Sequence, residues 1–193
     1  MCIIPIKFEG SFMNFYEDNK SVTKSIDSAA ACVVKYMTEH GLSLSCAESC
    51  TGGALAAAVT SVAGASAVFL GGAVTYTEEM KMKLVGVRRE TLERFTVYSA
   101  ETAAEMSEGV RELTGSDFGI GITGIAGPSG GTDEKPVGTV YVSVSGKNGT
   151  VTRDLALYKE YEKLDRRSIR ELTVLKSLEM LEDEFKKEER NGN

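Results

Sequence analysis

The order of the predicted strands and helices is the feature that most restricts the fold of this chain. Three short apolar segments, residues 42–46, 71–76 and 118–122, are separated by helix-like stretches. The alternating segment at 138–145 is instead followed directly by an Asn-Gly turn at 148–149, a strong hairpin signal. Strands linked by helices early and a hairpin late predict an α/β fold, a single domain with a mixed β-sheet flanked by helices.

Helical periodicity marks the segments between and after these strands. The expected helices are residues 25–40, 53–62, 77–83, 99–115 and 165–187. Ser25 or Asp27 is expected to cap the first of them, and Thr77 the third. Leu113 is expected on the inner face of the fourth helix. After the Asn-Gly turn, residues 150–158 are expected to return as the partner strand.

These elements fall within one domain. The 193 residues suit one medium domain. We expect residues 25–187 to form it, preceded by an appendage at 1–24 that is in part disordered and followed by a polar tail at 188–193.

Composition excludes several function classes. With 22 basic and 28 acidic residues the net charge is −6, and Trp is absent, so neither electrostatics nor base stacking favours nucleic acid. No apolar run approaches the roughly 18 residues that a membrane span requires. The four cysteines and single histidine are too few for a disulfide scaffold or an evident zinc site, so we expect no metal and free thiols in a reducing cytoplasm.

The most informative short segment is the polar turn Glu48-Ser49-Cys50, which leads into a Thr-Gly-Gly sequence and an alanine-rich helix. A serine between a strand end and a helix start is typical of an exposed nucleophile whose oxyanion meets helix N–H groups. The alternative is an ordinary turn in which Ser or Thr caps the helix. The two interpretations are compatible.

A serine nucleophile requires a base, and the only histidine, His40, lies at a predicted helix end. The base is therefore expected to be a lysine or a tyrosine. Tyr76 ends a predicted strand and Lys81 lies one turn into the next helix, so both side chains can reach a cleft. The alternative is that Lys81 and Lys83 are surface charges.

The glycine-rich segment 123–136 allows close backbone approach to a ligand. The alternative is a flexible surface connection, although loops of this length are more often functional. Gly119, Gly121 and Gly124 match GxGxxG, but the match lies inside a predicted strand and no helix follows, so it does not indicate a dinucleotide site.

Two arginines, Arg166 and Arg170, share one face at the start of the last helix. Cations there oppose the helix dipole, so a bound anion such as a phosphate would explain them. The alternative is a surface ion-pair cluster with Glu160, Glu162 and Glu171.

Together these segments resemble the CinA C-terminal domain family, the nicotinamide mononucleotide (NMN) deamidases. The resemblance runs from about residue 25 to 181 and is carried by five motifs. They are AESCTGG at 47–53, VTY at 74–76 with Lys81, TGIAGP at 123–128, EKPVGTV at 134–140, and Asp165-Arg166 with Arg170. Many family members have Gly before the Asp-Arg pair, where this chain has Leu164.

The resemblance implies hydrolysis of the NMN carboxamide to nicotinic acid mononucleotide and ammonia by a cytoplasmic enzyme that is usually a homodimer and needs no cofactor. Ser49 would be the nucleophile, and Lys81 and Tyr76 would activate it or transfer protons. The implied substrate-binding residues are Thr51, Gly52, Thr123, Gly124, Gly130, Gly131, Arg166 and Arg170. A non-catalytic or regulatory nucleotide-binding protein is the alternative, and hydrolysis of another amide nucleotide is a third possibility.

Overall fold

A single five-stranded mixed sheet organises the molecule. A computed structural model describes residues 15–161 and 164–191 of the chain. The sheet order is β2-β1-β3-β4-β5. The strands are β1 (Leu44–Glu48), β2 (Phe69–Val74), β3 (Phe118–Gly124), β4 (Val140–Gly146) and β5 (Gly149–Asp154). β1 is parallel to both β2 and β3, whereas β4 and β5 are antiparallel, so the predicted mixed sheet is confirmed.

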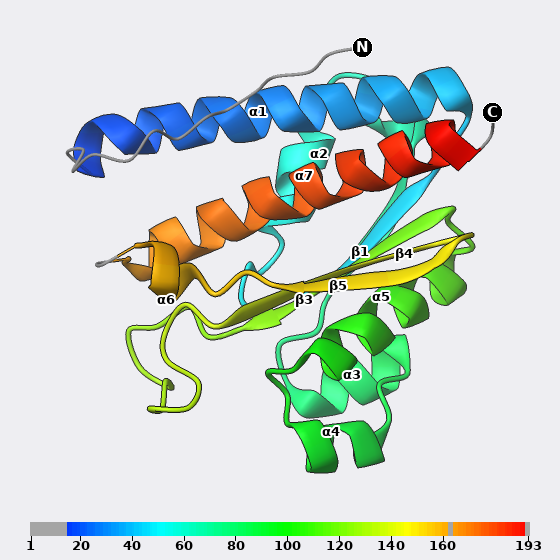
Figure 1. Cartoon of the computed structure of the whole chain (residues 1–193). Helices are drawn as coiled ribbons and strands as arrows, with labels where there is room; N and C mark the ends of the chain where they lie inside the picture. The colour runs from blue at the N-terminus through cyan, green and yellow to red at the C-terminus, as the bar shows by residue number, and fades with distance from the viewer. Residues whose placement is uncertain (1–14, 162–163, 192–193) are drawn as a thin grey trace.

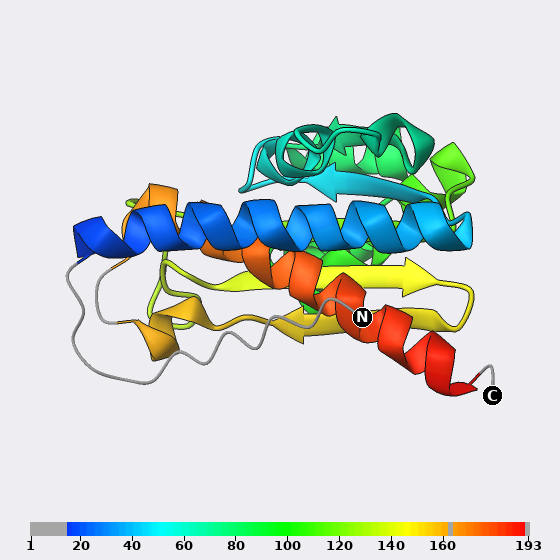
Figure 2. The same cartoon turned by 90° about the horizontal axis from the view of Figure 1, so that it is seen from above.

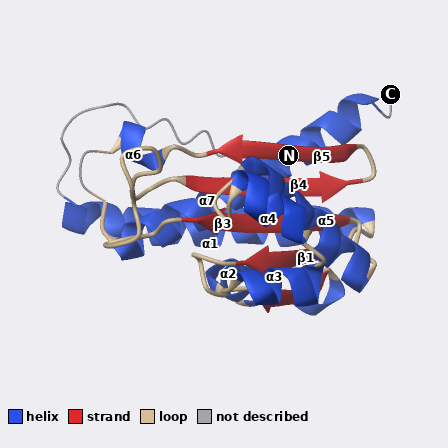
Figure 3. Cartoon of the chain, turned by 90° about the horizontal axis from the view of Figure 1, so that it is seen from below, coloured by secondary structure: helices blue, strands red, loops and turns tan. Residues whose placement is uncertain are grey.

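Helices cover both faces of this sheet (Figures 1 and 2). The helices are α1 (Phe15–His40), α2 (Ala54–Thr60), α3 (Glu78–Val85), α4 (Arg89–Phe95), α5 (Ala100–Thr114), α6 (Leu157–Glu160), α7 (Arg166–Asn191) and the 3-10 turn η1 (Ala65–Ala67). The long helices α1 and α7 lie with α2 on one face, and α3, α4 and α5 lie on the other (Figures 1 and 3). No helix in the described part of the chain has the length and apolar character to cross a bilayer.

The first helix is longer than the sequence suggested. α1 begins at Phe15 rather than Ser25, so residues 15–24 of the expected appendage are helical. Val22 already packs against the core four residues before buried Ile26, so the apolar periodicity starts earlier than the predicted boundary. Ser25 does not cap the helix, because its hydroxyl donates to the Ser21 carbonyl one turn earlier. Residues 1–14 and 192–193, which belong to the expected appendage and tail, lie outside the described residues.

The other predicted elements are present, but the strands predicted at 42–46 and 71–76 are displaced by two residues, to Leu44–Glu48 and Phe69–Val74. Tyr76 therefore lies two residues beyond β2 instead of ending it. Three further differences concern single elements. The strand after the Asn-Gly turn ends at Asp154 instead of 158, because Ala156 adopts a left-handed φ of 43° and α6 follows. Leu113 is 64% exposed instead of facing inward. α4 was not expected from the sequence.

Two glycines of β3 allow α5 to lie close to the sheet. A Cβ at Gly119 would be 2.2 Å from the Ser107 carbonyl oxygen, and one at Gly121 would be 2.3 Å from that of Ala103. Both distances are shorter than van der Waals contact, so only glycine fits. The GxGxxG match therefore serves helix–sheet packing, consistent with its exclusion as a dinucleotide motif.

The parallel part of the sheet determines where a site can form. β2, β1 and β3 are neighbours and run in the same direction, so their carboxyl ends meet at one edge. Ser49 follows β1, the segment leading to α3 follows β2, and the glycine loop follows β3. Such an edge is where open α/β sheets bind ligands.

Candidate active site

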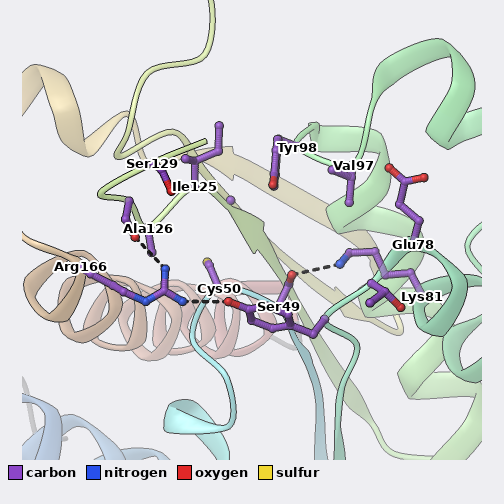
Figure 4. A pocket seen from close by; sticks show the side chains of 14 residues that line it. Ser49, Cys50, Glu78, Lys81, Val97, Tyr98, Ile125, Ala126, Ser129 and Arg166 are labelled. Carbon is purple, nitrogen blue, oxygen red and sulfur yellow. Dashed lines mark hydrogen bonds between the residues drawn. The ribbon is translucent and has the colours of Figure 1, made fainter. Parts of the chain in front are cut away.

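Ser49 lies directly after β1 and carries the hydroxyl of the candidate site. The residue is 6% exposed and lines a pocket of about 390 Å³. The pocket is bounded by residues that follow all three parallel strands (Figure 4). This volume lies in the range of small-molecule sites.

Lys81 is the group that contacts Ser49. Its Nζ lies 3.0 Å from Ser49 Oγ and donates a 2.7 Å hydrogen bond to the Thr75 carbonyl oxygen. The side chain is fully buried, and burial lowers its pKa to about 8, while the nearby Glu78 opposes the shift. The surface-charge interpretation is therefore wrong for Lys81, although it holds for the exposed Lys83.

Lys81 reaches this position because of the turn that precedes it. Thr75 continues from β2 and its N–H donates to the Glu48 carbonyl oxygen at 2.8 Å, which holds the two strand ends together. Thr77 then caps α3 by accepting from the Met80 N–H at 3.2 Å, as predicted. One turn of helix from this cap places Lys81 against the end of β1.

Glu48 occupies the N-terminus of α2. Its carboxylate accepts from the N–H groups of Gly53, Leu55 and Ala56 at 3.0, 3.1 and 2.9 Å. The sequence-based expectation that these helix N–H groups meet an oxyanion is therefore wrong, since a side chain from the preceding strand already satisfies them. The alternative in which a Ser or Thr caps the helix is also wrong, because the N-cap residue is Gly53 and no side chain caps from that position.

Cys50 lines the pocket beside Ser49 but is a poor nucleophile. Burial raises the pKa of its thiol to about 12, so the thiol stays protonated at neutral pH. Burial likewise raises the pKa of Cys46, whose Sγ lies 3.5 Å from Glu48 Oε1. Within the described residues, no group of three or more His, Cys, Asp or Glu side chains is placed to hold a metal ion.

Tyr76 and Arg166 form a pair at the pocket wall. The guanidinium of Arg166 donates to the Tyr76 hydroxyl and to the Gly127 carbonyl oxygen, each at 2.8 Å (Figure 4). Tyr76 is 58% exposed, and no hydrogen bond joins it to Ser49 or Lys81 in the described structure. Arg166 thus ties the segment after β2 to the glycine loop after β3.

Comparison with known proteins gives the family of this fold and site. Residues 26–185 match the model of the CinA C-terminal domain. The chain belongs to the CinA family. A CinA-like protein of Parasynechococcus marenigrum is 44% identical over 155 residues, which cover 80% of this chain and 36% of that protein. Another CinA-like protein, from Kosmotoga olearia, is 44% identical over 142 residues, or 74% of this chain and 34% of that protein.

Solved structures of CinA relatives share the fold. The competence/damage inducible protein CihA from Agrobacterium tumefaciens has a TM-score of 0.77 at 38% identity, covering 90% of this chain and 97% of that one. A CinA superfamily protein from Escherichia coli has a TM-score of 0.76 at 33% identity, covering 82% and 90%. The chain spans about a third of the length of the curated relatives it matches, so it corresponds to one part of those longer proteins.

The pocket of this CinA domain contains only some of the residues singled out in the sequence. Five of them line it, namely Ser49, Tyr76, Lys81, Gly124 and Arg166. Six do not, namely Thr51, Gly52, Thr123, Gly130, Gly131 and Arg170.

Arg170 supports the serine turn from behind instead of facing the pocket. Its guanidinium donates to the Thr51 carbonyl oxygen through Nε at 3.1 Å and Nη2 at 2.7 Å, and Gly52 lies against it. The alternative of an ion-pair cluster is not formed by Arg166 or Arg170 in the described part of the chain, where Glu171 instead bonds Arg167 at 2.7 Å. Glu162 lies outside the described residues.

Nine further residues line the pocket, and most of them belong to segments already singled out, such as Ser129 in the glycine-rich segment. Sequence reasoning missed Val97 and Tyr98 and did not single out Glu78, although the proximity of Glu78 to Lys81 was an available signal. Val97 and Tyr98 precede α5, and only the folded chain brings them to this edge.

Proposed function

We propose that this domain hydrolyses the carboxamide of NMN, giving nicotinic acid mononucleotide and ammonia through a serine acyl-enzyme. The observation that carries the proposal is the contact of 3.0 Å between Ser49 Oγ and a fully buried Lys81 Nζ. A buried lysine with a lowered pKa supplies a neutral amine near physiological pH, as a serine–lysine mechanism requires.

In the first half of the reaction Lys81 acts as base and then as acid. Its neutral amine accepts the Ser49 hydroxyl proton while Oγ forms a bond to the carboxamide carbon. The resulting ammonium then donates that proton to the amide nitrogen, the C–N bond breaks and ammonia leaves. The product of this half is an ester between Ser49 and the nicotinoyl group.

In the second half Lys81 deprotonates a water molecule that attacks the ester carbon. The Ser49 oxygen leaves and recovers its proton from Lys81, so the enzyme returns to its starting state with the carboxylic acid released. The Thr75 carbonyl oxygen, which accepts from Nζ at 2.7 Å, holds the amine in place through both halves. None of these steps uses a metal or an organic cofactor.

The identity of the substrate rests on the resemblance to the NMN deamidases, and the charges around the pocket are compatible with it. NMN carries a cationic pyridinium carboxamide at one end and a phosphate at the other. Arg166 offers a cation at one wall of the pocket and Glu78 an anion near Lys81. A ligand with opposite charges at its two ends suits this arrangement.

The test is ammonia release from NMN by the purified protein and its Ser49→Ala variant, with nicotinamide and NAD as control substrates. We expect release from NMN by the parent only, and trapping of the acyl-enzyme by hydroxylamine as the hydroxamate. Ser61→Ala, the same substitution at an exposed position beside α2, is the matched control and should keep full activity. If NMN binds but no ammonia is released, the domain is a nucleotide-binding or regulatory protein and the amidase proposal fails.

A further inference from the structure

The segment between α4 and α5 forms a wall of the pocket without regular secondary structure of its own. Val97 and Tyr98 line the pocket from this segment. Figure 4 shows Tyr98 projecting into the space above Ser49 and Lys81. The side chain is half-buried, and its hydroxyl makes no hydrogen bond to the described residues, so the ring is positioned through its backbone.

The backbone of this wall is held by Lys135, a residue of the EKPVGTV motif. Its Nζ donates to Thr96 Oγ1 and to the Tyr98 carbonyl oxygen, both at 2.7 Å, and to the Phe95 carbonyl oxygen at 3.4 Å. Thr123 adds a hydrogen bond of 2.7 Å from its hydroxyl to the Val97 carbonyl oxygen. Thr123 at the end of β3 and Lys135 in the glycine loop therefore hold Thr96, Val97 and Tyr98 of this wall.

The wall also has a backbone conformation that requires such support. Thr96 has a φ of 70°, in the left-handed region that a β-branched residue rarely adopts. Residues held in such conformations persist when the surroundings determine them, and they concentrate at ligand sites. The bonds from Lys135 to Thr96 and Tyr98 supply that constraint.

We propose that Tyr98 is a specificity-determining residue whose ring stacks on the planar ring of the substrate, and that Lys135 is a positioning residue that holds Tyr98 in place. The inference rests on the proposed amidase function and names the class of substrate favoured, a cationic aromatic carboxamide. A tyrosine face attracts a ring nitrogen that carries positive charge, as in aromatic sites for quaternary nitrogen. Glu78 lines the same pocket and adds a negative charge that favours the same class.

The first measurement compares Tyr98→Ala and Tyr98→Phe for NMN hydrolysis. Loss of the ring should raise KM roughly 3- to 30-fold, the range of stacking and cation–π contacts, with kcat nearly unchanged. Tyr98→Phe keeps the ring and should stay near the parent. The same substitutions in the Ser49→Ala background, followed by calorimetry with NMN, report binding without turnover.

The second measurement is a double-mutant cycle between Lys135→Met and Tyr98→Ala. If Lys135 acts through Tyr98, Lys135→Met raises KM in the parent but adds little in the Tyr98→Ala background, whereas a general structural defect would add fully. Lys135→Arg, which keeps a cation with several donors, should restore much of the parent KM. Lys83→Met, which removes the same charge from an exposed position, is the control.

The third measurement compares NMN with its reduced form, whose dihydropyridine carboxamide is neutral. Tyr98→Ala should lose more affinity for the cationic ring than for the neutral ring. Unchanged KM and unchanged discrimination in Tyr98→Ala would overturn the Tyr98 assignment and leave the amidase intact. If the parent binds NMN without releasing ammonia and Tyr98→Ala binds NMN more weakly, the role of Tyr98 in binding is supported and the amidase proposal is overturned. A parent that neither binds nor hydrolyses NMN overturns both.

Discussion

Two buried charged side chains flank Ser49, and the fold treats them in opposite ways. Glu48, on the side of α2, accepts three backbone hydrogen bonds from the start of that helix. Lys81, on the side of α3, has one carbonyl oxygen and the hydroxyl of Ser49 as its partners. Both residues are 1% exposed or less. The two charges are therefore equally removed from water but unequally compensated.

This difference separates a structural role from a chemical one. The Glu48 carboxylate satisfies several N–H groups at the start of α2 and so holds the turn that presents Ser49. A lysine with few partners in a buried site gives up its proton more easily, which suits a base. The comparison predicts that changes at Glu48 act mainly on stability and changes at Lys81 mainly on rate.

The largest effect is expected for Lys81→Met. Removal of the proposed base should lower kcat roughly 10²- to 10⁴-fold. The free energy of unfolding should change little, because two contributions oppose each other. Lowering the Lys81 pKa from 10.5 to about 8 corresponds to roughly 3 kcal/mol of burial cost, which the variant avoids. Loss of the hydrogen bond to the Thr75 carbonyl oxygen costs about 1–3 kcal/mol. Ammonia release and thermal unfolding measured on the same sample test both statements. A variant that keeps more than a tenth of the parent kcat would remove Lys81 from the mechanism.

The next effect is expected for Glu48→Ala. It leaves the N–H groups of Gly53, Leu55 and Ala56 without their acceptor, so the free energy of unfolding should fall by about 3 kcal/mol. Glu48→Gln keeps an acceptor oxygen and should lose about half as much. Denaturant unfolding of the two variants gives the values. If Glu48→Gln unfolds like the parent yet loses as much kcat as Lys81→Met, Glu48 has a chemical role and the contrast between the two residues is wrong.

A smaller and continuous effect is expected from pH. Because the proposed mechanism uses the neutral amine of Lys81, kcat/KM should increase about tenfold per pH unit below pH 8 and level off above it. Glu78 opposes the lowering of the Lys81 pKa, so Glu78→Gln should shift the rise in kcat/KM to lower pH. The profile is measured from pH 6.5 to 9.5 with the amount of folded protein checked at each point. A flat profile would contradict a lysine base in this range.

The contrast between Glu48 and Lys81 also shows what a sequence of this kind can predict. The strand–turn–helix position of Ser49 follows from local residue types, and so does the cap at Thr77 that sets Lys81 one turn into α3. The role of Glu48 does not, because its partners lie five to eight residues ahead and depend on how the turn folds back. Lys135 and Tyr98 are 37 residues apart, and only the assembled edge of the sheet brings them together.

The smallest effect is expected at Tyr76, which sequence reasoning grouped with Lys81 as a catalytic residue. In the structure its hydroxyl accepts from Arg166 at 2.8 Å and the residue is 58% exposed, so it resembles a wall residue more than a buried acid or base. Tyr76→Phe removes only this bond and should change kcat/KM less than about tenfold, mainly through KM, because Arg166 loses one of two anchors. Steady-state kinetics on NMN measure the change, with Tyr158→Phe, a tyrosine outside the pocket, as control. A fall in kcat near that of Lys81→Met would instead make Tyr76 a proton-transfer group, so that Lys81 and Tyr76 would share the chemical role.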